Sequence, residues 1–490
     1  MTRRSKAKRW LGRPDDPSPL SPTDSAARRI TVPLVPPVAD LDEPDETTEV
    51  GQHWVTQSAK WSVRRSPEFG PLVVPTGNSD GPVHRWFHLK EAFSRDLLPQ
   101  LLQLLPEAKS PDGGLTIVDP FSGVGTTMLS SVELLRDGHL SSLRGYGLEV
   151  NPFLQFVSSV KVRSALSDTE ADVNTLLSLV KVAGGLAVST SDFPSLSTFR
   201  NERYFPPTHL EQLVKLRRAI DVMGLDETNR DWARLALAMT VEPASRLRRD
   251  GRALRYEARE PLAPMQVFER AVGRISHDVS TFGAVTGGDV EIVQGSAATP
   301  EWQLVGPSSA DLVVFSPPYP NNIDYTEVYK TELWALSFVT DADEFREQRQ
   351  ATLRSHPSVK FRREVAYLEG DRAAEVASVL GPVVKAIPAT SRYAKPLERM
   401  ICGYADDMLT TFDAAFKSLR KGGYCVYVVG NSVHGTAEDP VMIASDVMLG
   451  RLAELAGFEV EVVLVARDLP RRRTASRFVR ESVVVLRKPF

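Results

Sequence analysis

The tetrapeptide Ser316-Pro317-Pro318-Tyr319 combines residue types that could hold an amino group on a flat ring. It follows an apolar run at 312–315, which is typical of a buried parallel strand. Proline fixes its own φ and cannot continue a strand ladder, so the strand must end there with its carbonyl groups held rigidly. These carbonyls and the Ser316 hydroxyl can accept hydrogen bonds from an amine while Tyr319 stacks on the ring. The pattern predicts a nucleobase pocket, although Pro-Pro-aromatic at a strand end can also be a simple turn.

A second motif places a glycine loop between a predicted strand and a predicted helix. The strand at 115–119 ends in Asp119 and is followed by Pro-Phe-Ser-Gly-Val-Gly-Thr-Thr at 120–127. Such a loop lets backbone N–H groups and a helix N-terminus approach a ligand. The third glycine of the dinucleotide fingerprint is replaced by Met128, which disfavours a nicotinamide dehydrogenase. Asp119 would repel a phosphate but would suit a cationic or amino-bearing ligand.

The next predicted strand, at 144–149, ends in the acidic residue Glu149. An acid after the strand that follows a glycine loop can bind ribose hydroxyls. Glu149 lies somewhat further along the chain than the usual spacing of about 20 residues. An alternative role is the N-cap of a helix that begins near Asn151-Pro152.

Taken together, Asp-Pro-Phe-x-Gly-x-Gly-Thr-Thr at 119–127 and Ser-Pro-Pro-Tyr at 316–319 resemble the S-adenosylmethionine-dependent DNA amino-methyltransferases. The resemblance covers residues 80–490, and Ser-Pro-Pro-Tyr is similar to the N4-cytosine type, whereas adenine-N6 enzymes more often begin with Asp or Asn. The stretch 84–88, continuing to Phe93, resembles their N-terminal cofactor motif, in which an aromatic ring covers the methionine part. Two features depart from the family: Ser296 follows the strand that usually ends in an adenine-contacting Asp, and the glycine loop precedes the catalytic motif, the reverse of many N4-cytosine enzymes.

The resemblance implies S-adenosylmethionine as the cofactor and no metal. It implies that the cofactor is bound by Phe93, Asp119, Pro120, Phe121, Gly123, Gly125, Thr126, Glu149 and Ser296. It implies that Ser316, Pro317, Pro318 and Tyr319 form the catalytic site and hold a base flipped out of the duplex. Methylation of a cytosine ring carbon would need a nucleophilic cysteine, but Cys402 and Cys425 both lie far from this motif in sequence. We therefore expect direct methyl transfer to an exocyclic nitrogen.

These motifs require an α/β fold, and the remaining sequence supplies its elements. We expect seven strands near 115–119, 144–149, 290–295, 311–316, 424–430, 459–466 and 482–487. We expect helices near 128–135, 209–223, 231–239, 325–336, 408–419 and 443–455, with a turn at Lys421-Gly422-Gly423. The last two strands have no helix between them, as in a hairpin. The predicted fold is a Rossmann-like, seven-stranded methyltransferase sheet with a mostly helical insertion.

The chain divides into four predicted parts. Residues 1–50 are rich in proline, begin basic and end acidic, and are expected to be a disordered tail. Residues 51–160 should form the N-terminal, cofactor-binding part of the methyltransferase domain, and 286–490 its catalytic part. Between them, 161–285 is the helical insertion and a candidate for target recognition. Within the catalytic part, 341–395 is a second candidate DNA-contacting segment.

Composition bounds the class of protein and its partners. The chain has 490 residues, 42% of them hydrophobic, only two cysteines and a net charge of −3. It has neither a run of 18 apolar residues nor a signal peptide, so we expect a cytoplasmic protein with no membrane contact. Local arginine clusters could bind DNA phosphates, or could form solvated faces balanced by acids such as Glu257 and Glu260. The candidate DNA contacts are Arg246, Arg248, Arg249, Arg252, Arg346, Arg349, Arg471 and Arg472.

The predicted function is site-specific DNA methylation at cytosine N4, in a restriction-modification or anti-phage context with a separate defence partner. The context follows from the family resemblance alone. Three alternatives stay open: an adenine-N6 DNA methyltransferase, an RNA amino-methyltransferase, and a catalytically silent DNA-binding subunit that keeps the fold.

Overall fold

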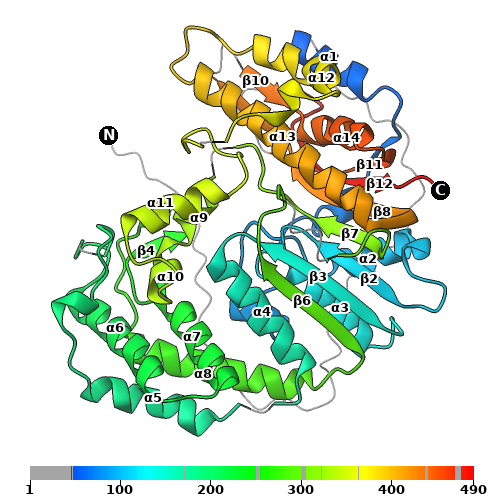
Figure 1. Cartoon of the computed structure of the whole chain (residues 1–490). Helices are drawn as coiled ribbons and strands as arrows, with labels where there is room; N and C mark the ends of the chain where they lie inside the picture. The colour runs from blue at the N-terminus through cyan, green and yellow to red at the C-terminus, as the bar shows by residue number, and fades with distance from the viewer. Residues whose placement is uncertain are drawn as a thin grey trace, which may run out of the picture. The chain divides into compact units, whose positions relative to one another are not determined.

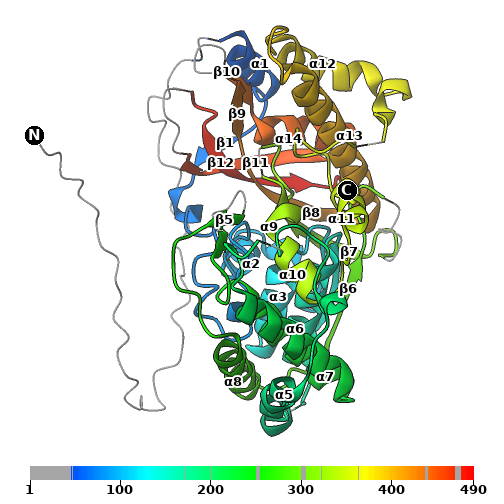
Figure 2. The same cartoon turned by 90° about the vertical axis from the view of Figure 1, so that its left-hand side faces the viewer.

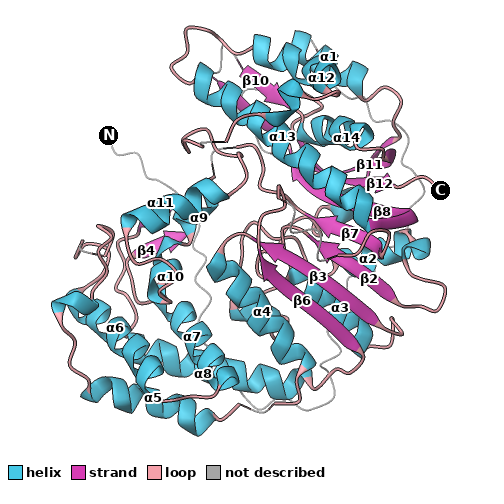
Figure 3. Ribbon diagram, in the orientation of Figure 1, coloured by secondary structure: helices cyan, strands magenta, loops and turns pink. Residues whose placement is uncertain are grey.

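The fold is built around one large sheet that contains all seven predicted strands (Figures 1 and 3). The structure is a computed structural model, and it describes residues 46, 48–169, 171–199, 201–249, 254–299, 305–321, 323–361, 363–435, 440–469 and 476–490. The predicted tail therefore lies almost entirely outside the described residues. The seven strands are β2 (Leu115–Asp119), β3 (Leu143–Glu149), β6 (Gly288–Gln294), β7 (Ala310–Phe315), β8 (Leu419–Gly430), β11 (Glu459–Asp468) and β12 (Arg480–Arg487).

An eighth strand, β1 (Val63–Arg65), corrects the predicted count of seven. It pairs in parallel with β11 at the edge of the sheet. Its sequence, Val-Arg-Arg, has no run of apolar residues. An edge strand of three residues buries little side-chain surface and does not need such a run. The sequence pattern therefore could not reveal it.

The strand order is β1-β11-β12-β8-β7-β2-β3-β6. Strands β6, β3, β2, β7 and β8 pair in parallel, and β12 runs antiparallel between β8 and β11. The last two strands form the predicted antiparallel pair. This α/β architecture is the Rossmann-like methyltransferase fold that the sequence predicted.

Strand β7 lies in the middle of the sheet and is covered on both faces, as its apolar sequence predicted. Leu312 and Val314 belong to one hydrophobic core, and Val313 and Phe315 belong to another on the opposite face. Successive side chains of a strand point to opposite faces, so an apolar run of this kind serves two cores at once.

Helices cover both faces of the sheet (Figure 1). The first core includes side chains of α2 (Leu97–Leu104), α3 (Thr126–Arg136) and α4 (Pro152–Leu166). The second includes side chains of α1 (Glu49–Gln57), α12 (Ala373–Lys385), α13 (Ala394–Ser418) and α14 (Ser445–Leu455). Helix α13 is much longer than the predicted helix at 408–419. In the described part of the chain, no helix is both long and apolar enough to cross a bilayer.

The segment 161–285 is mostly helical, and its first residues complete α4. It contains α5 (Val173–Gly185), α6 (Pro207–Val222), α7 (Glu227–Val241), α8 (Pro264–Phe282) and a hairpin of β4 (Leu247–Arg249) and β5 (Leu254–Tyr256). Figures 1 and 2 place α5–α8 on the opposite side of the sheet from α12–α14. Apolar side chains of these helices join the first core, so the insertion packs continuously with that face.

Short elements connect β7 to the rest of the sheet. The helix predicted at 325–336 is two short helices, α9 (Tyr325–Val328) and α10 (Lys330–Ala335), and α11 (Ala342–Ala351) follows. The predicted turn at 421–423 lies within the span of β8, where the pairing with β7 skips from Leu419 to Tyr424. After β8, the chain forms a second small hairpin of β9 (Ser432–Gly435) and β10 (Pro440–Ile443). Short 3-10 helices occupy Pro67–Phe69, His84–Trp86, Pro106–Ala108, Thr190–Asp192 and Ala366–Glu369.

Candidate active site

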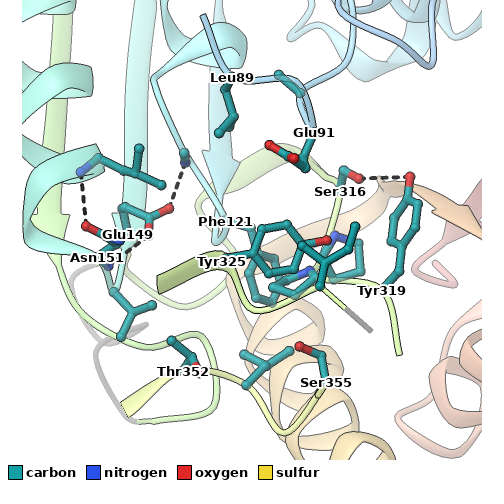
Figure 4. A pocket seen from close by; sticks show the side chains of 18 of the residues that line it. Leu89, Glu91, Phe121, Glu149, Asn151, Ser316, Tyr319, Tyr325, Thr352 and Ser355 are labelled. Carbon is teal, nitrogen blue, oxygen red and sulfur yellow. Dashed lines mark hydrogen bonds between the residues drawn. The ribbon is translucent and has the colours of Figure 1, made fainter. Parts of the chain in front are cut away.

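A cavity of about 260 Å³ opens at the carboxyl ends of β2, β3 and β7 (Figure 4). In open α/β sheets this edge is where ligands bind, because the strands end there and leave a crevice. The cavity brings together two motifs that are far apart in the sequence. The predicted site residues that line it are Pro120, Phe121, Gly123, Glu149, Ser296, Ser316, Pro317, Pro318 and Tyr319.

The glycine loop makes a tight turn between β2 and α3. Gly123 has φ of 53° and Gly125 has φ of 82°, both in the left-handed region that favours glycine. A Cβ atom on Gly125 would lie 2.5 Å from the Ser158 Oγ of α4. Gly125 is therefore needed for close packing against α4. Thr126 is the first residue of α3, and neither residue lines the cavity.

Asp119 lies at the end of β2 but is turned away from the cavity, which its predicted role as a cofactor contact did not anticipate. Its carboxylate accepts hydrogen bonds from the Phe121 backbone N–H at 3.0 Å and the Thr127 hydroxyl at 2.5 Å. Burial raises its pKa to about 7. In this structure Asp119 holds the loop in shape.

Glu149 lies in the wall of the cavity, with its carboxylate beside the glycine loop (Figure 4). Its two oxygens accept from the backbone N–H groups of Gly123 at 2.9 Å and Asn151 at 2.8 Å. Burial raises its pKa to about 7, against the lowering effect of these hydrogen bonds. The N-cap of α4 is Asn151, whose side chain accepts from the first N–H groups of the helix, so the alternative role of Glu149 is taken by its neighbour.

The N-terminal motif contributes another wall of the cavity. Leu89, Lys90, Glu91 and Ala92 line it, whereas Phe93 is buried in the first core and does not line it. Glu91 accepts a hydrogen bond from the Tyr329 hydroxyl at 3.1 Å, and burial raises the pKa of its carboxyl group. The segment that the resemblance identified therefore reaches the cavity through Leu89 to Ala92.

Ser316-Pro317-Pro318-Tyr319, which we call the Ser-Pro-Pro-Tyr lip, follows the end of β7. Ser316 donates its hydroxyl proton to the Val428 carbonyl at 3.1 Å, which leaves oxygen lone pairs free to accept a hydrogen bond. Tyr319 is partly buried, and its hydroxyl donates to the Glu481 carboxylate at 2.9 Å. The hydroxyl end of the tyrosine is thus fixed by Glu481.

Sequence reasoning did not identify several other lining residues. Tyr325 of α9 and a segment after α11 that includes Thr352 and Ser355 close one side of the cavity (Figure 4). The Asn321 backbone N–H donates to the Ser355 carbonyl at 3.2 Å, which ties that segment to the lip. Arg467 and Glu481, from the last two strands, also line the cavity. These residues come from segments that are far apart in the sequence, so their place in the cavity is known only from the tertiary structure.

Arg354 anchors this closing segment to α13. Its buried guanidinium donates to Asp406 at 2.7 Å and Asp407 at 2.7 Å, and its backbone N–H also donates to Asp407. Both acids lie on α13, so the pocket-lining residues on either side of Arg354 are fixed to the second core.

The arginines predicted to contact DNA have different surroundings. Arg248 and Arg346 are largely exposed, with side-chain exposures of 61% and 59%, and each pairs with a nearby acid. Arg246 is less exposed and lies near Glu260. Arg349 pairs with Asp324, a residue that lines the cavity. Arg252, Arg471 and Arg472 lie outside the described residues.

Arg249, which was a candidate DNA contact, is buried. It pairs with Glu332 of α10 and, at 2.7 Å, with Glu242. Its guanidinium lies 4.9 Å from the centre of the Phe87 ring. Its alternation with exposed Arg248 follows from their adjacent places on β4, since neighbouring strand residues point to opposite sides.

Neither cysteine is placed for nucleophilic attack at the cavity. Cys425 is buried within β8, and Cys402 is half-buried on α13. Both are free thiols, and burial raises the pKa of each. Among the residues that the structure describes, no three His, Cys, Asp or Glu side chains cluster to hold a metal ion.

Comparison with known proteins identifies relatives that are methyltransferases. The chain is 25% identical over 458 residues to the type II methyltransferase M.AvaI of Nostoc sp. and of Anabaena variabilis, covering 85% of this chain and 89% of each relative. It is 23% identical over 437 residues to the type II methyltransferase M.BsoBI of Geobacillus stearothermophilus, covering 79% of this chain and 81% of that protein.

No family model matches the chain. Among solved structures, the rRNA methyltransferase aviRa from Streptomyces viridochromogenes aligns with a TM-score of 0.26 and 10% identity, covering 81% of this chain and 85% of that one. The sequence relatives and the strand order together support a methyltransferase: over most of its length, the chain is similar to type II methyltransferases of bacteria.

Proposed function

We propose that this protein is an S-adenosylmethionine-dependent DNA methyltransferase that modifies the N4 amine of a flipped cytosine. The observation that carries the proposal is the single cavity lined by both the glycine loop with Glu149 and the Ser-Pro-Pro-Tyr lip. A donor site and an acceptor site that share one cavity are what a group transfer requires. The similarity to type II methyltransferases supports DNA as the substrate and a restriction-modification setting.

The residues of the glycine-loop side fit S-adenosylmethionine. Glu149 presents a carboxylate that can accept from ribose hydroxyls, and the positive-φ turn at Gly123 lets the ligand approach the backbone closely. Phe121, Ser296 and the wall from Leu89 to Ala92 would enclose the rest of the molecule. When bound, the cofactor supplies an electrophilic methyl group on a sulfonium.

The lip side fits an exocyclic amine. The Ser316 hydroxyl donates its proton to the Val428 carbonyl, and its oxygen lone pairs can accept a hydrogen bond from the amine. The Pro317 carbonyl can accept a second hydrogen bond, and both together would direct the nitrogen lone pair toward the donor side of the cavity. Tyr319 would replace the stacking that a base loses when it leaves the duplex. No cysteine lines the cavity, which favours an amino nitrogen over a ring carbon as the acceptor.

Cytosine is favoured over adenine by Ser316 as the first residue of the lip. The choice of base and the product are tested together by nucleoside mass spectrometry of DNA from cells that express the protein, with Tyr319→Ala as the inactive control. N4-methylcytosine that disappears in the variant supports the proposal. N6-methyladenine would replace it with the adenine-N6 alternative, and the absence of both marks would direct attention to RNA or to a binding role.

We predict that Ser316→Ala slows methyl transfer by roughly fivefold, since one hydrogen bond to the amine contributes about 1 kcal/mol. The dissociation constant for S-adenosylmethionine should not change, because Ser316 lies on the lip side. Single-turnover rates and calorimetric titration measure the two quantities. Ser309→Ala is the matched control, since Ser309 is exposed, immediately precedes β7 and donates its hydroxyl proton to the nearby Gly306 carbonyl. Equal rates for both variants would remove Ser316 from the mechanism.

A further inference from the structure

Strand β12 contributes a buried acid, Glu481, to the cavity wall behind the lip. Glu481 is 4% exposed and lies on β12, directly opposite Gly430 of β8 and Arg467 of β11. Its two oxygens have different partners: Oε1 accepts from the Tyr319 hydroxyl at 2.9 Å, and Oε2 accepts from the Arg467 Nε at 2.5 Å. Glu481, Tyr319 and Arg467 all line the cavity.

These contacts extend to the serine of the lip. The Ser316 Oγ lies 3.4 Å from the Tyr319 hydroxyl (Figure 4). An uninterrupted set of polar contacts therefore runs from Arg467 through Glu481 and Tyr319 to Ser316. Burial and the neighbouring Glu481 carboxylate raise the pKa of Tyr319 well above its usual value. The tyrosine therefore remains a phenol and keeps its proton to donate to Glu481.

The tyrosine ring is also positioned by a close approach to the backbone. A Cβ atom on Gly430 would lie 2.9 Å from Cε2 of Tyr319 and 3.6 Å from Oε1 of Glu481. The ring thus rests on the glycine at the end of β8, where any larger residue would displace it. The position is set by a steric contact on one side and by the Glu481 hydrogen bond on the other.

We propose that Glu481 is a positioning residue that holds the Tyr319 ring ready to receive the flipped base. The inference rests on the proposed function and names the determinant of base capture within that site. A ring held in one orientation loses little conformational freedom when a base stacks on it, so preorganisation favours capture. Without the carboxylate, the ring could rotate about its side-chain bonds and would have to be ordered anew by each base.

The proposal predicts a specific division between kinetic constants. Glu481→Ala should raise the KM for DNA by roughly tenfold or more, as expected for a lost charge-assisted hydrogen bond, while the affinity for S-adenosylmethionine stays within about twofold. Glu481→Gln should recover part of the loss, because the amide oxygen can still accept from Tyr319. Glu461→Ala is the matched control: Glu461 lies on β11, pairs with Arg487 of β12, and does not line the cavity.

Base capture is measured directly with DNA that carries 2-aminopurine at the target position. Its fluorescence rises when the base leaves the stack, and wild-type protein and Glu461→Ala should give the same rise. Glu481→Ala and Tyr319→Phe should both give a smaller one, and the double variant should be no worse than the more affected single variant, because both remove the same hydrogen bond. Gly430→Ala should also reduce the signal, because its Cβ would crowd the Tyr319 ring at 2.9 Å while lying at an ordinary contact distance of 3.6 Å from Glu481.

Two results would overturn the inference while leaving the proposed function intact. The first is a wild-type protein that methylates DNA and a folded Glu481→Ala variant whose KM for DNA and fluorescence match those of Glu461→Ala. The second is a Tyr319→Phe variant with unchanged constants, which tests the same hydrogen bond even if Glu481→Ala fails to fold. A wild-type protein that methylates no DNA base would instead reject the proposed function itself.

Discussion

At the scale of single residues, Glu149 connects burial to cofactor binding. Its carboxyl group has a pKa of about 7, raised by burial, and it lines the cavity. Hydrogen bonds from ribose hydroxyls favour the ionised carboxylate. We therefore predict that the affinity for S-adenosylmethionine increases as the pH rises through about 7, and that Glu149→Gln abolishes most of this dependence. Calorimetric titration between pH 6 and pH 8 measures the effect.

Asp119 provides the comparison for this prediction. Its pKa is also about 7, but it lies outside the cavity and bonds the loop instead. Asp119→Asn should weaken binding at every pH through the loop and should retain the pH step. A step that persists in Glu149→Gln and vanishes in Asp119→Asn would show that the titrating group is the loop acid.

The raised pKa values of Glu149 and Asp119 also make the stability of the fold depend on pH, in the direction opposite to that of cofactor affinity. A carboxyl whose folded pKa is raised stabilises the fold most when it is protonated. The contribution of Glu149 and Asp119 is complete below their ordinary pKa values of 4.5 and 3.8, and it is lost as the pH rises through about 7. Binding and folding thus favour different protonation states of Glu149, as is common where a functional group is buried.

At the scale of elements, the turn between β2 and α3 depends on Gly125. We predict that Gly125→Ala lowers the free energy of unfolding by about 2–4 kcal/mol, because the residue has positive φ and its new Cβ would contact the Ser158 main chain at 3.2 Å as well as its side chain. Urea unfolding measures the change. Gly273→Ala is the control, since Gly273 is exposed on α8 and a Cβ atom there would meet no other group within 4 Å. This variant should stabilise the protein by up to about 1 kcal/mol. Similar values for the two variants would contradict the steric account.

The elements that periodicity predicted well are those whose side chains face a core directly. Strand β7 has apolar residues for both cores and was predicted within one residue. Strand β1 and the break between α9 and α10 were missed, because a short edge strand buries little surface and two abutting helices share one apolar stripe. Phe93 was expected to bind the cofactor on resemblance; it is buried in the first core, while Leu89 and Glu91 line the cavity.

At the scale of the whole molecule, Arg249 joins the helical insertion to the methyltransferase core. We predict that Arg249→Ala destabilises the protein by about 3–5 kcal/mol, because it leaves the buried Glu332 without its ionic partner. The adjacent Arg248→Ala should change stability by less than about 1 kcal/mol, since its pair with Glu257 is exposed. Thermal unfolding separates the two, and equal shifts would contradict the buried role.

DNA binding should show the reverse order for these two arginines. If the hairpin of β4 and β5 contacts phosphates, Arg248→Ala should weaken binding and reduce its salt dependence by about one counterion. Arg249→Ala, measured on protein that is still folded, should leave the salt dependence unchanged. Fluorescence anisotropy at several salt concentrations measures both.

The sequence by itself determined the α/β class, the seven long strands and the two motifs at strand ends. Local patterns are sufficient there, because an apolar run, a proline stop and a Gly-x-Gly loop each follow from a few neighbouring residues. Only the tertiary structure decided which side chains share the cavity. Tyr319 bonds Glu481, which is 162 residues away, and Arg249 pairs with Glu332, which is 83 residues away. Such contacts depend on strand order and on which side of a strand each residue faces, and no local pattern in the chain carries that information.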